Sequence, residues 1–289
     1  MTVPDVSVVI PFFRGVDQLK RAVASVCAQT FDSFEIIVVS DDSPENLSGF
    51  AAEFPEVKIV ELPQNSGPGV ARNAGISRAN GSFVAFLDSD DWWYPEKLAI
   101  QIPQMVESNA VWSHHPYDIV TDSGRLLRRV DNVDISGDVR DATLRSFRVQ
   151  TSCMVIRRDV LCAEGFGFSD DRIGEDDALY RSLARNYPIQ RTPHVLSAFV
   201  SHGSNAGFSP AIQLWSRWRT ARNFSRDEWR ELAALDRVAY GWVWLTAIAL
   251  GVANPEQPKT GHRRLVIGAA YLPAWLLFRR PTRRRAART

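Results

Sequence analysis

Short apolar runs alternate with helical segments over the first hundred residues, and this alternation constrains the fold more than any other feature of the sequence. The runs are rich in β-branched and aromatic residues, as buried strands are. Strand, helix and strand at this spacing predict parallel pairs joined by crossover helices, and hence an α/β fold with a mostly parallel sheet flanked by helices. The expected strands are Val6–Ile10, Phe34–Val39, Val57–Leu62 and Phe83–Leu87, and the expected helices are Gln18–Ala28, Pro44–Phe54 and Val70–Ala79.

Carboxylates follow two of the expected strands. Asp41 and Asp42 come after the second strand, and Asp88, Asp90 and Asp91 come after the fourth. Ligands of open α/β sheets bind at the edge formed by the carboxyl ends of the strands. Two carboxylates one residue apart offer oxygen ligands to Mg²⁺ or Mn²⁺, which could hold a diphosphate on its other side. The alternative is an ordinary solvated turn.

The segment after the third strand partly matches a dinucleotide-binding fingerprint. Gly67-x-Gly69 follows a strand and opens a helix, but Arg72 stands where the fingerprint has Gly or Ala, which argues against a Rossmann dehydrogenase. Arg72 is either a ligand of a nucleotide phosphate or an exposed helix arginine. Asp42 is either an acceptor for the N–H groups of a nucleobase or part of an Asx turn or helix cap ahead of Pro44.

Five segments in order along the chain resemble the family 2 glycosyltransferases with the GT-A fold. They are Ser7-Val-Val-Ile-Pro11, Val39-Ser-Asp-Asp-Ser43, Asn65-x-Gly67-x-x-x-Ala71-Arg72-Asn73-x-Gly75, Gly81-x-Phe83-Val-Ala-Phe-Leu-Asp-Ser-Asp-Asp91 and Pro95-x-Lys97-Leu98. The resemblance implies an inverting enzyme that uses a nucleotide sugar. It implies that Asp88 faces the nucleotide and that Asp90 holds the metal, Mg²⁺ or Mn²⁺. The donor-binding residues that it implies are Pro11, Phe12, Asp42, Arg72, Asp88 and Ser89.

Two later segments extend the resemblance. Gly174-Glu175-Asp176 matches the family segment whose aspartate is the catalytic base, which implies that role for Asp176. The alternative for these carboxylates is the favourable field at a helix N-terminus. Upstream, Gly165-Phe-Gly-Phe-Ser-Asp-Asp171 departs from the family pattern. His202 resembles a histidine that some members place near the metal, although a lone histidine after a strand is equally interpreted as structural.

The C-terminal part of the chain differs in charge from the rest. Eight arginines and no acidic residue lie in 262–289, so a chain of net charge +1 combines an acidic body with a basic tail. We expect a glycosyltransferase domain over 1–206 and a helical C-terminal extension over 207–289, with one helix from Ser225 toward Leu250. The apolar segment 263–280 is too short to span a bilayer, and we expect it either to lie in the membrane interface or to dock on the body.

The sequence thus predicts an enzyme that transfers a sugar, most plausibly from a UDP-sugar, to a glycan or a lipid-linked glycan in polysaccharide or glycolipid assembly. The alternatives are a non-catalytic module that binds nucleotide sugars or glycans, and a sugar nucleotidyltransferase. The three cysteines form no Cys-x-x-Cys pair and no signal peptide is recognised, so we expect a cytoplasmic protein with a peripheral contact at the inner face of the membrane. No recognition motif accompanies the arginines, and nucleic acid is not expected as a partner.

Overall fold

The structure is a computed structural model that describes residues 4–145, 147, 149–163, 166–171, 174–201, 218, 221, 224, 226–232 and 234–249. The chain divides into two compact units, one of residues 1–139 and 148–202 and the other of residues 140–147 and 203–289. The sequence did not reveal that residues 140–147 belong with the C-terminal part. The expected boundary after residue 206 lies outside the described residues and remains a prediction.

The first unit is built on a seven-stranded sheet in the order β10-β6-β9-β4-β1-β2-β3. β1 pairs in parallel with β2 and β4, while β9 runs antiparallel to its neighbours β4 and β6. The expected mostly parallel sheet is therefore confirmed. The strands are β1 (Val6–Phe12), β2 (Phe34–Ser40), β3 (Lys58–Glu61), β4 (Phe83–Phe86), β6 (Trp112–His114), β9 (Val155–Arg157) and β10 (Ile189–Arg191).

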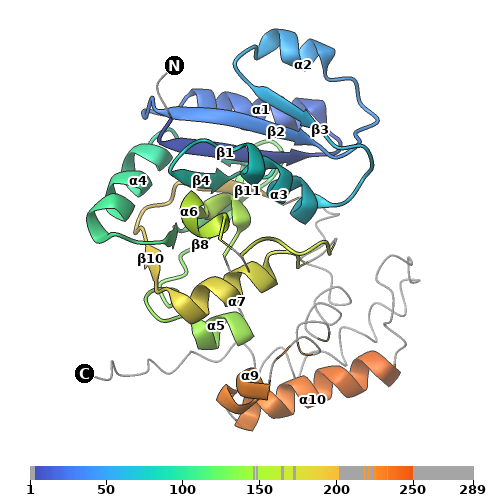
Figure 1. Cartoon of the computed structure of the whole chain (residues 1–289), viewed down its shortest axis with the longest axis vertical. Helices are drawn as coiled ribbons and strands as arrows, with labels where there is room; N and C mark the ends of the chain where they lie inside the picture. The colour runs from blue at the N-terminus through green and yellow to red at the C-terminus, as the bar shows by residue number, and fades with distance from the viewer. Residues whose placement is uncertain are drawn as a thin grey trace. The chain divides into compact units, whose positions relative to one another are not determined.

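Helices cover both faces of this sheet, with α3 in front of it and α1 behind it in Figure 1. The apolar stripe of α1, which includes Leu19 and Val23, packs in one core with alternate residues of β1 such as Val8. On the other face, Gly75 of α3 lies so close to β1 that a Cβ there would meet a methyl carbon of Val9 at 2.4 Å. The helices of this unit are α1 (Val16–Cys27), α2 (Ser48–Glu53), α3 (Pro68–Arg78), α4 (Lys97–Ser108), α6 (Arg158–Leu161) and α7 (Asp177–Asn186).

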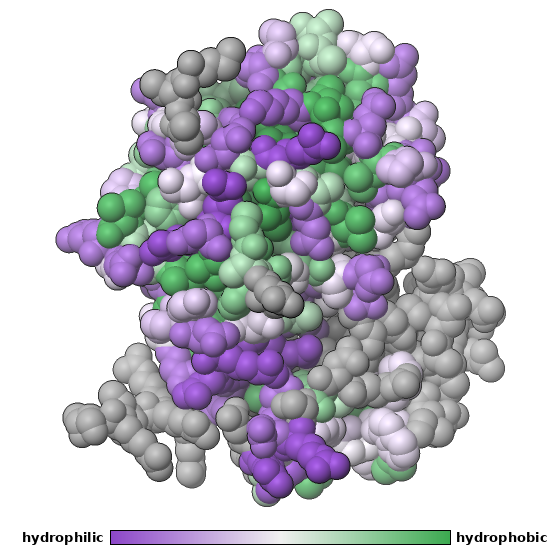
Figure 2. Space-filling model, in the orientation of Figure 1, coloured by the Kyte–Doolittle hydropathy of each residue, from purple (hydrophilic) through white to green (hydrophobic). Residues whose placement is uncertain are grey.

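The amphipathic helix α7 illustrates how the outer layer forms. Leu179, Tyr180 and Leu183 are buried, whereas Arg185 is exposed. The outward face of α7 is hydrophilic in the view of Figure 2. This spacing of apolar residues at three and four positions is what anchors a helix on a core.

A second, four-stranded sheet lies beside the first in the same unit, in the order β5-β11-β7-β8. Its strands are β5 (Trp92–Trp93), β7 (Tyr117–Val120), β8 (Leu126–Val130) and β11 (Ser197–Val200). β7 and β8 form an antiparallel hairpin. Ahead of β9, residues Thr151–Cys153 form a 3₁₀ turn (η1) that directs the Ser152 hydroxyl to the loop after β4.

The second unit is helical in its described part, with α5 (Arg140–Arg145), α9 (Arg226–Glu231) and α10 (Ala234–Ala249). The expectation of one continuous helix from Ser225 is wrong, since the helix is interrupted between Glu231 and Ala234. The interruption accompanies edge-to-face packing of Phe224, Trp229 and Tyr240, an arrangement that aromatic rings favour. No helix in the described ranges is both long and apolar enough to cross a membrane. The expected interfacial segment 263–280 lies outside the described residues.

Candidate active site

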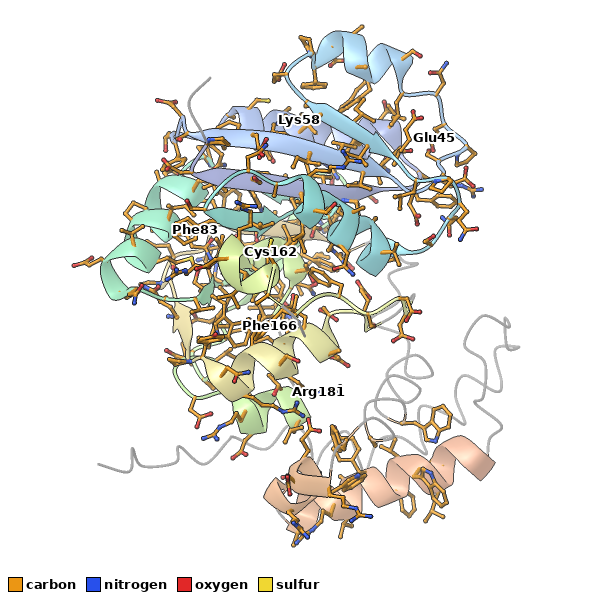
Figure 3. All side chains as sticks on the ribbon, in the orientation of Figure 1. Glu45, Lys58, Phe83, Cys162, Phe166 and Arg181 are labelled. Carbon is orange, nitrogen blue, oxygen red and sulfur yellow. The ribbon has the colours of Figure 1, made fainter. Side chains whose placement is uncertain are left out.

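The ends of β1, β2 and β4 bring most of the predicted donor-binding residues to one edge of the sheet. Pro11 and Phe12 close β1, opposite the last residues of β2. Asp42 follows β2, and Asp88 follows β4 after Leu87 donates to the Val9 carbonyl. Figure 3 shows Glu45, which follows β2, and Phe83, which begins β4, at opposite ends of the sheet. Pro11 and Phe12 are buried, so their side chains belong mainly to the core of this edge.

The neighbouring aspartates after β2 have separate environments. Asp41 is buried, and its carboxylate accepts the backbone N–H groups of Ser66 at 2.7 Å and Gly67 at 2.8 Å. It thereby fixes the loop that begins α3, a role that the sequence analysis missed. Asp42 is exposed, its backbone is left-handed with φ of 52°, and its side chain does not cap α2. Within the described ranges the Asp42 carboxylate has no protein partner, which leaves it available to a ligand.

The loop after β4 is anchored through Asp91. This carboxylate is fully buried and accepts the Ser152 hydroxyl at 2.6 Å and the Val200 N–H at 2.9 Å. Burial, and then the nearby charges of Asp90 and Asp88, raise the pKa of Asp91 well above its usual range. Ser152 also accepts the N–H of Asp88 at 3.1 Å. Asp91 is therefore a structural anchor, and the preceding residues Asp88, Ser89 and Asp90 are half-buried.

Arg21 of α1 holds the same loop from its other side. Its two terminal nitrogens donate to the carbonyls of Asp90 and Asp122, each at 3.0 Å. Its guanidinium carbon lies 4.5 Å from the centre of the Trp92 ring, a distance at which a cation attracts an aromatic face. The loop that carries Asp90 is thus tied both to a helix and to the β7–β8 hairpin.

The donor set for a divalent cation consists of Asp88 and Asp90. No cluster of three or more His, Cys, Asp or Glu side chains suited to a metal occurs in the described part of the chain. His202, which was predicted beside Asp90 as a metal ligand, lies outside the described residues. Oδ1 of Asp88 accepts a hydrogen bond from Arg72, and Asp90 lies two positions further along the same loop. Two carboxylates suit Mg²⁺ or Mn²⁺ when substrate phosphates and water complete the coordination, so the residues present fit such an ion.

Arg72 is not an exposed helix arginine, since only 3% of it is accessible. One terminal nitrogen donates to Asp88 Oδ1 and the other to Glu175 Oε1, both at 2.6 Å. Burial by itself would lower the pKa of Arg72, but the carboxylates of Asp88 and Glu175 raise it further above its ordinary value. The guanidinium carbon also lies 5.2 Å from the centre of the Phe168 ring. The segments that contain the predicted donor site and the predicted base therefore meet at one buried arginine.

Asp176 stands at the N-cap of α7, yet its side chain makes no capping hydrogen bond. This geometry argues against a carboxylate that serves only the helix terminus. The Thr151 hydroxyl lies 3.4 Å from Asp176 Oδ2 and itself accepts the Tyr180 hydroxyl at 3.1 Å. Burial, and then the charges of Glu175 and Asp177, raise the pKa of Asp176 well above its usual range. A carboxylate with a raised pKa is better suited to accept a proton near neutral pH.

Comparisons with known proteins identify the family of the chain. The sequence profile of Glycosyl transferase family 2 matches residues 7–162. An uncharacterised glycosyltransferase of Rickettsia conorii is 32% identical over 208 residues, which are 71% of this chain and 34% of that protein. The chain thus spans about a third of the length of this relative.

Two further proteins are similar to this chain, one in sequence and one in structure. The Escherichia coli protein WfgD, named as a UDP-Glc:α-D-GlcNAc-diphosphoundecaprenol β-1,3-glucosyltransferase, is 33% identical over 120 residues, 41% of this chain and 47% of that protein. The mannosyltransferase PcManGT of Pyrobaculum calidifontis, solved with GDP-Man and Mn²⁺, superposes with a TM-score of 0.63 at 17% identity, covering 96% of this chain and 84% of that chain. The latter likeness establishes the shared GT-A fold.

Proposed function

The chain belongs to glycosyl transferase family 2, and from this premise we propose that it transfers a sugar from a UDP-sugar to an acceptor hydroxyl with inversion at the anomeric carbon. The observation that carries the proposal is the meeting of two carboxylate groups at one buried arginine. One is Asp88, which belongs to the predicted donor site. The other is Glu175, which lies next to Asp176, the predicted base.

The donor nucleotide is proposed to lie across the carboxyl edge of the sheet. The exposed carboxylate of Asp42 would accept N–H groups of the base, while the buried Pro11 and Phe12 would form the apolar floor of that edge. Asp88 and Ser89 would face the nucleotide. A UDP donor is supported by the relative WfgD, which is named as a UDP-Glc-dependent glucosyltransferase.

Asp90 and Oδ2 of Asp88 would hold Mg²⁺ or Mn²⁺, with His202 as a further candidate ligand. When bound, such an ion would neutralise charge that develops on the leaving diphosphate. Arg21 and Asp91 hold the loop after β4, which carries Asp88 and Asp90, through the contacts described above.

Asp176 is the proposed general base. It would take the proton from the acceptor hydroxyl as that oxygen attacks the anomeric carbon from the face opposite the diphosphate. The new carbon–oxygen bond forms as the bond to the diphosphate breaks, so that a single displacement inverts the configuration. A positioned base contributes about 10²–10⁴-fold to such a step.

The proposed acceptor is a glycan or a lipid-linked glycan, in polysaccharide or glycolipid assembly. The relative WfgD is named for a diphosphoundecaprenol-linked acceptor, which supports this class. The basic tail with its eight arginines complements an anionic lipid surface, so we include a peripheral membrane contact in the proposal.

The test is release of nucleoside diphosphate by the purified chain from a panel of UDP-, GDP- and dTDP-sugars with Mn²⁺, measured with and without EDTA. We expect metal-dependent release from one donor, and a loss of at least about 100-fold in Asp176→Asn. Asp177→Asn is the matched control at the next carboxylate: it should keep transfer, with the pH profile moved to lower pH because one of the charges that raise the pKa of Asp176 is removed. Equal release in Asp176→Asn and wild type would refute the assignment of the base, and no binding of any donor by calorimetry would refute the proposed function.

A further inference from the structure

One face of α3 carries three contacts to the segment that leads to the predicted base. Gly69, Arg72 and Asn73 lie three and four positions apart, so they share one side of the helix. All three contact residues between 168 and 175. The helix that begins beside the donor edge therefore also forms the support of the base segment.

Two of these contacts fix the backbone of that segment. The Asn73 side chain donates to the Phe168 carbonyl at 2.8 Å and accepts the Phe168 N–H at 3.0 Å, as a strand neighbour would. A Cβ on Gly69 would lie 2.1 Å from the Ser169 carbonyl oxygen and 2.9 Å from Cβ of Glu175. Only glycine permits this close approach, so the segment is held tightly on α3.

The third contact is the ion triad of Asp88, Arg72 and Glu175. A single buried guanidinium is shared by two carboxylates, and its Nε has no partner in the described structure. Arg72 thus shares its positive charge between Asp88 of the predicted donor site and Glu175, which precedes the predicted base. A ligand that binds Asp88 weakens the ion pair between Asp88 and Arg72. Its binding therefore changes how strongly Arg72 pairs with Glu175.

We propose that Arg72 is a positioning residue that couples donor binding at Asp88 to the placement of the base segment through Glu175. This inference rests on the proposed function, in which Asp88 serves the donor and Asp176 is the base. Glu175 pairs with Arg72 and not with the loop after β4 that carries Asp88. Because coupling between two sites is reciprocal, a change at Glu175 nevertheless alters donor affinity.

The coupling predicts a specific response of the segment 166–177. In wild type, adding the UDP-sugar identified by the release assay together with Mn²⁺ should lower amide hydrogen exchange in this segment by about tenfold. In Arg72→Lys the protection should be lost, because a lysine presents one compact ammonium and cannot hold two carboxylates in the fork geometry of arginine. Arg78→Lys, at the exposed end of the same helix, is the matched control and should keep the wild-type response.

Kinetics separates positioning from simple phosphate binding. If Arg72 positions the base segment, Arg72→Lys and Glu175→Gln should each lower kcat by about 10–100-fold and weaken donor binding by a similar small factor, and the double variant should be no worse than either single one. If Arg72 only binds the donor, Arg72→Lys should raise KM and leave kcat near wild type. That second pattern would overturn the inference.

The proposed function and the inference fail in distinguishable ways. Absence of donor binding and of release in the wild type removes the proposed function itself. Normal release in the wild type, with the exchange of segment 166–177 unchanged by donor, overturns the coupling alone. Because Glu175→Gln retains the shape of the side chain and an acceptor oxygen, it tests the idea even if Arg72→Lys does not fold.

Discussion

Lys97 at the start of α4 is fully buried without a carboxylate partner in the described part of the chain. Its ammonium donates to Gln101 Oε1 at 2.8 Å and lies 4.1 Å from the centre of the Trp93 ring. Burial lowers the pKa of Lys97 from 10.5 to about 7. A lysine of this kind makes stability depend on pH, because the unfolded chain holds its proton over a range where the folded chain has released it.

The size of the effect follows from the two pKa values. Between pH 7 and pH 10.5 the unfolded state binds more protons than the folded state at this site, so the free energy of unfolding rises with pH. Integration from pH 7 to pH 9 gives a gain of about 2 kcal/mol from Lys97 alone. Below about pH 6 both states are protonated and the contribution becomes constant.

The perturbation is Lys97→Met, which keeps the length of the side chain and removes the titrating group. Gln101 loses one donor in this variant, a cost of about 1–3 kcal/mol that does not vary with pH. The assay is urea denaturation of wild type and variant at pH 6, 7, 8 and 9. The difference in unfolding free energy, wild type minus variant, should rise by about 2 kcal/mol between pH 7 and pH 9.

The matched control is Lys58→Met, at a lysine whose side chain is 55% exposed and which Figure 3 labels on the sheet. Its stability difference from wild type should remain flat over the same pH range. A difference for Lys97→Met that is equally flat would show that Lys97 keeps its proton in the folded state, and the argument from burial would then be wrong.

Three further predictions concern the site. Asp42→Ala should weaken donor binding by about 10–100-fold in calorimetry without changing the melting temperature, since its carboxylate has no partner among the residues that the structure describes; unchanged affinity would exclude it from the base pocket. Asp91→Asn should lower the free energy of unfolding by about 1–3 kcal/mol in urea, because one amide end must face the Ser152 or Val200 donor; a variant as stable as wild type would contradict the anchoring role. The transfer rate should fall as pH falls through the raised pKa of Asp176, because the base acts only when deprotonated; a pH profile flat down to pH 4 would refute this.

The strand pattern predicted the sheet because each short apolar run had the length and composition of a buried strand. β1, β2 and β4 lie within two residues of their expected bounds, and the predicted site residues Asp42 and Asp88 follow them at one edge. Local pattern sufficed here, since the carboxyl ends of parallel strands necessarily share an edge.

The partners of the buried polar residues could not be predicted in the same way. Arg72 pairs with Glu175, 103 positions away, and Asp91 accepts from Val200, 109 positions away. Such pairings depend on how distant segments pack and leave no periodic trace in the sequence. A weak signal did exist for Asp41, because Gly67 cannot cap α3 with a side chain and the free N–H groups there require an acceptor from elsewhere.

The interrupted course of the second unit affects the order in which the chain can fold during synthesis. Residues 140–147 emerge from the ribosome long before their partners, and the Tyr240 hydroxyl that bonds the Leu144 carbonyl is separated from it by 96 positions. The sheet of the first unit can form around this short insertion, while the insertion itself must wait for α10. A nascent chain therefore carries a loop without its docking partner over much of translation, and the second unit closes last.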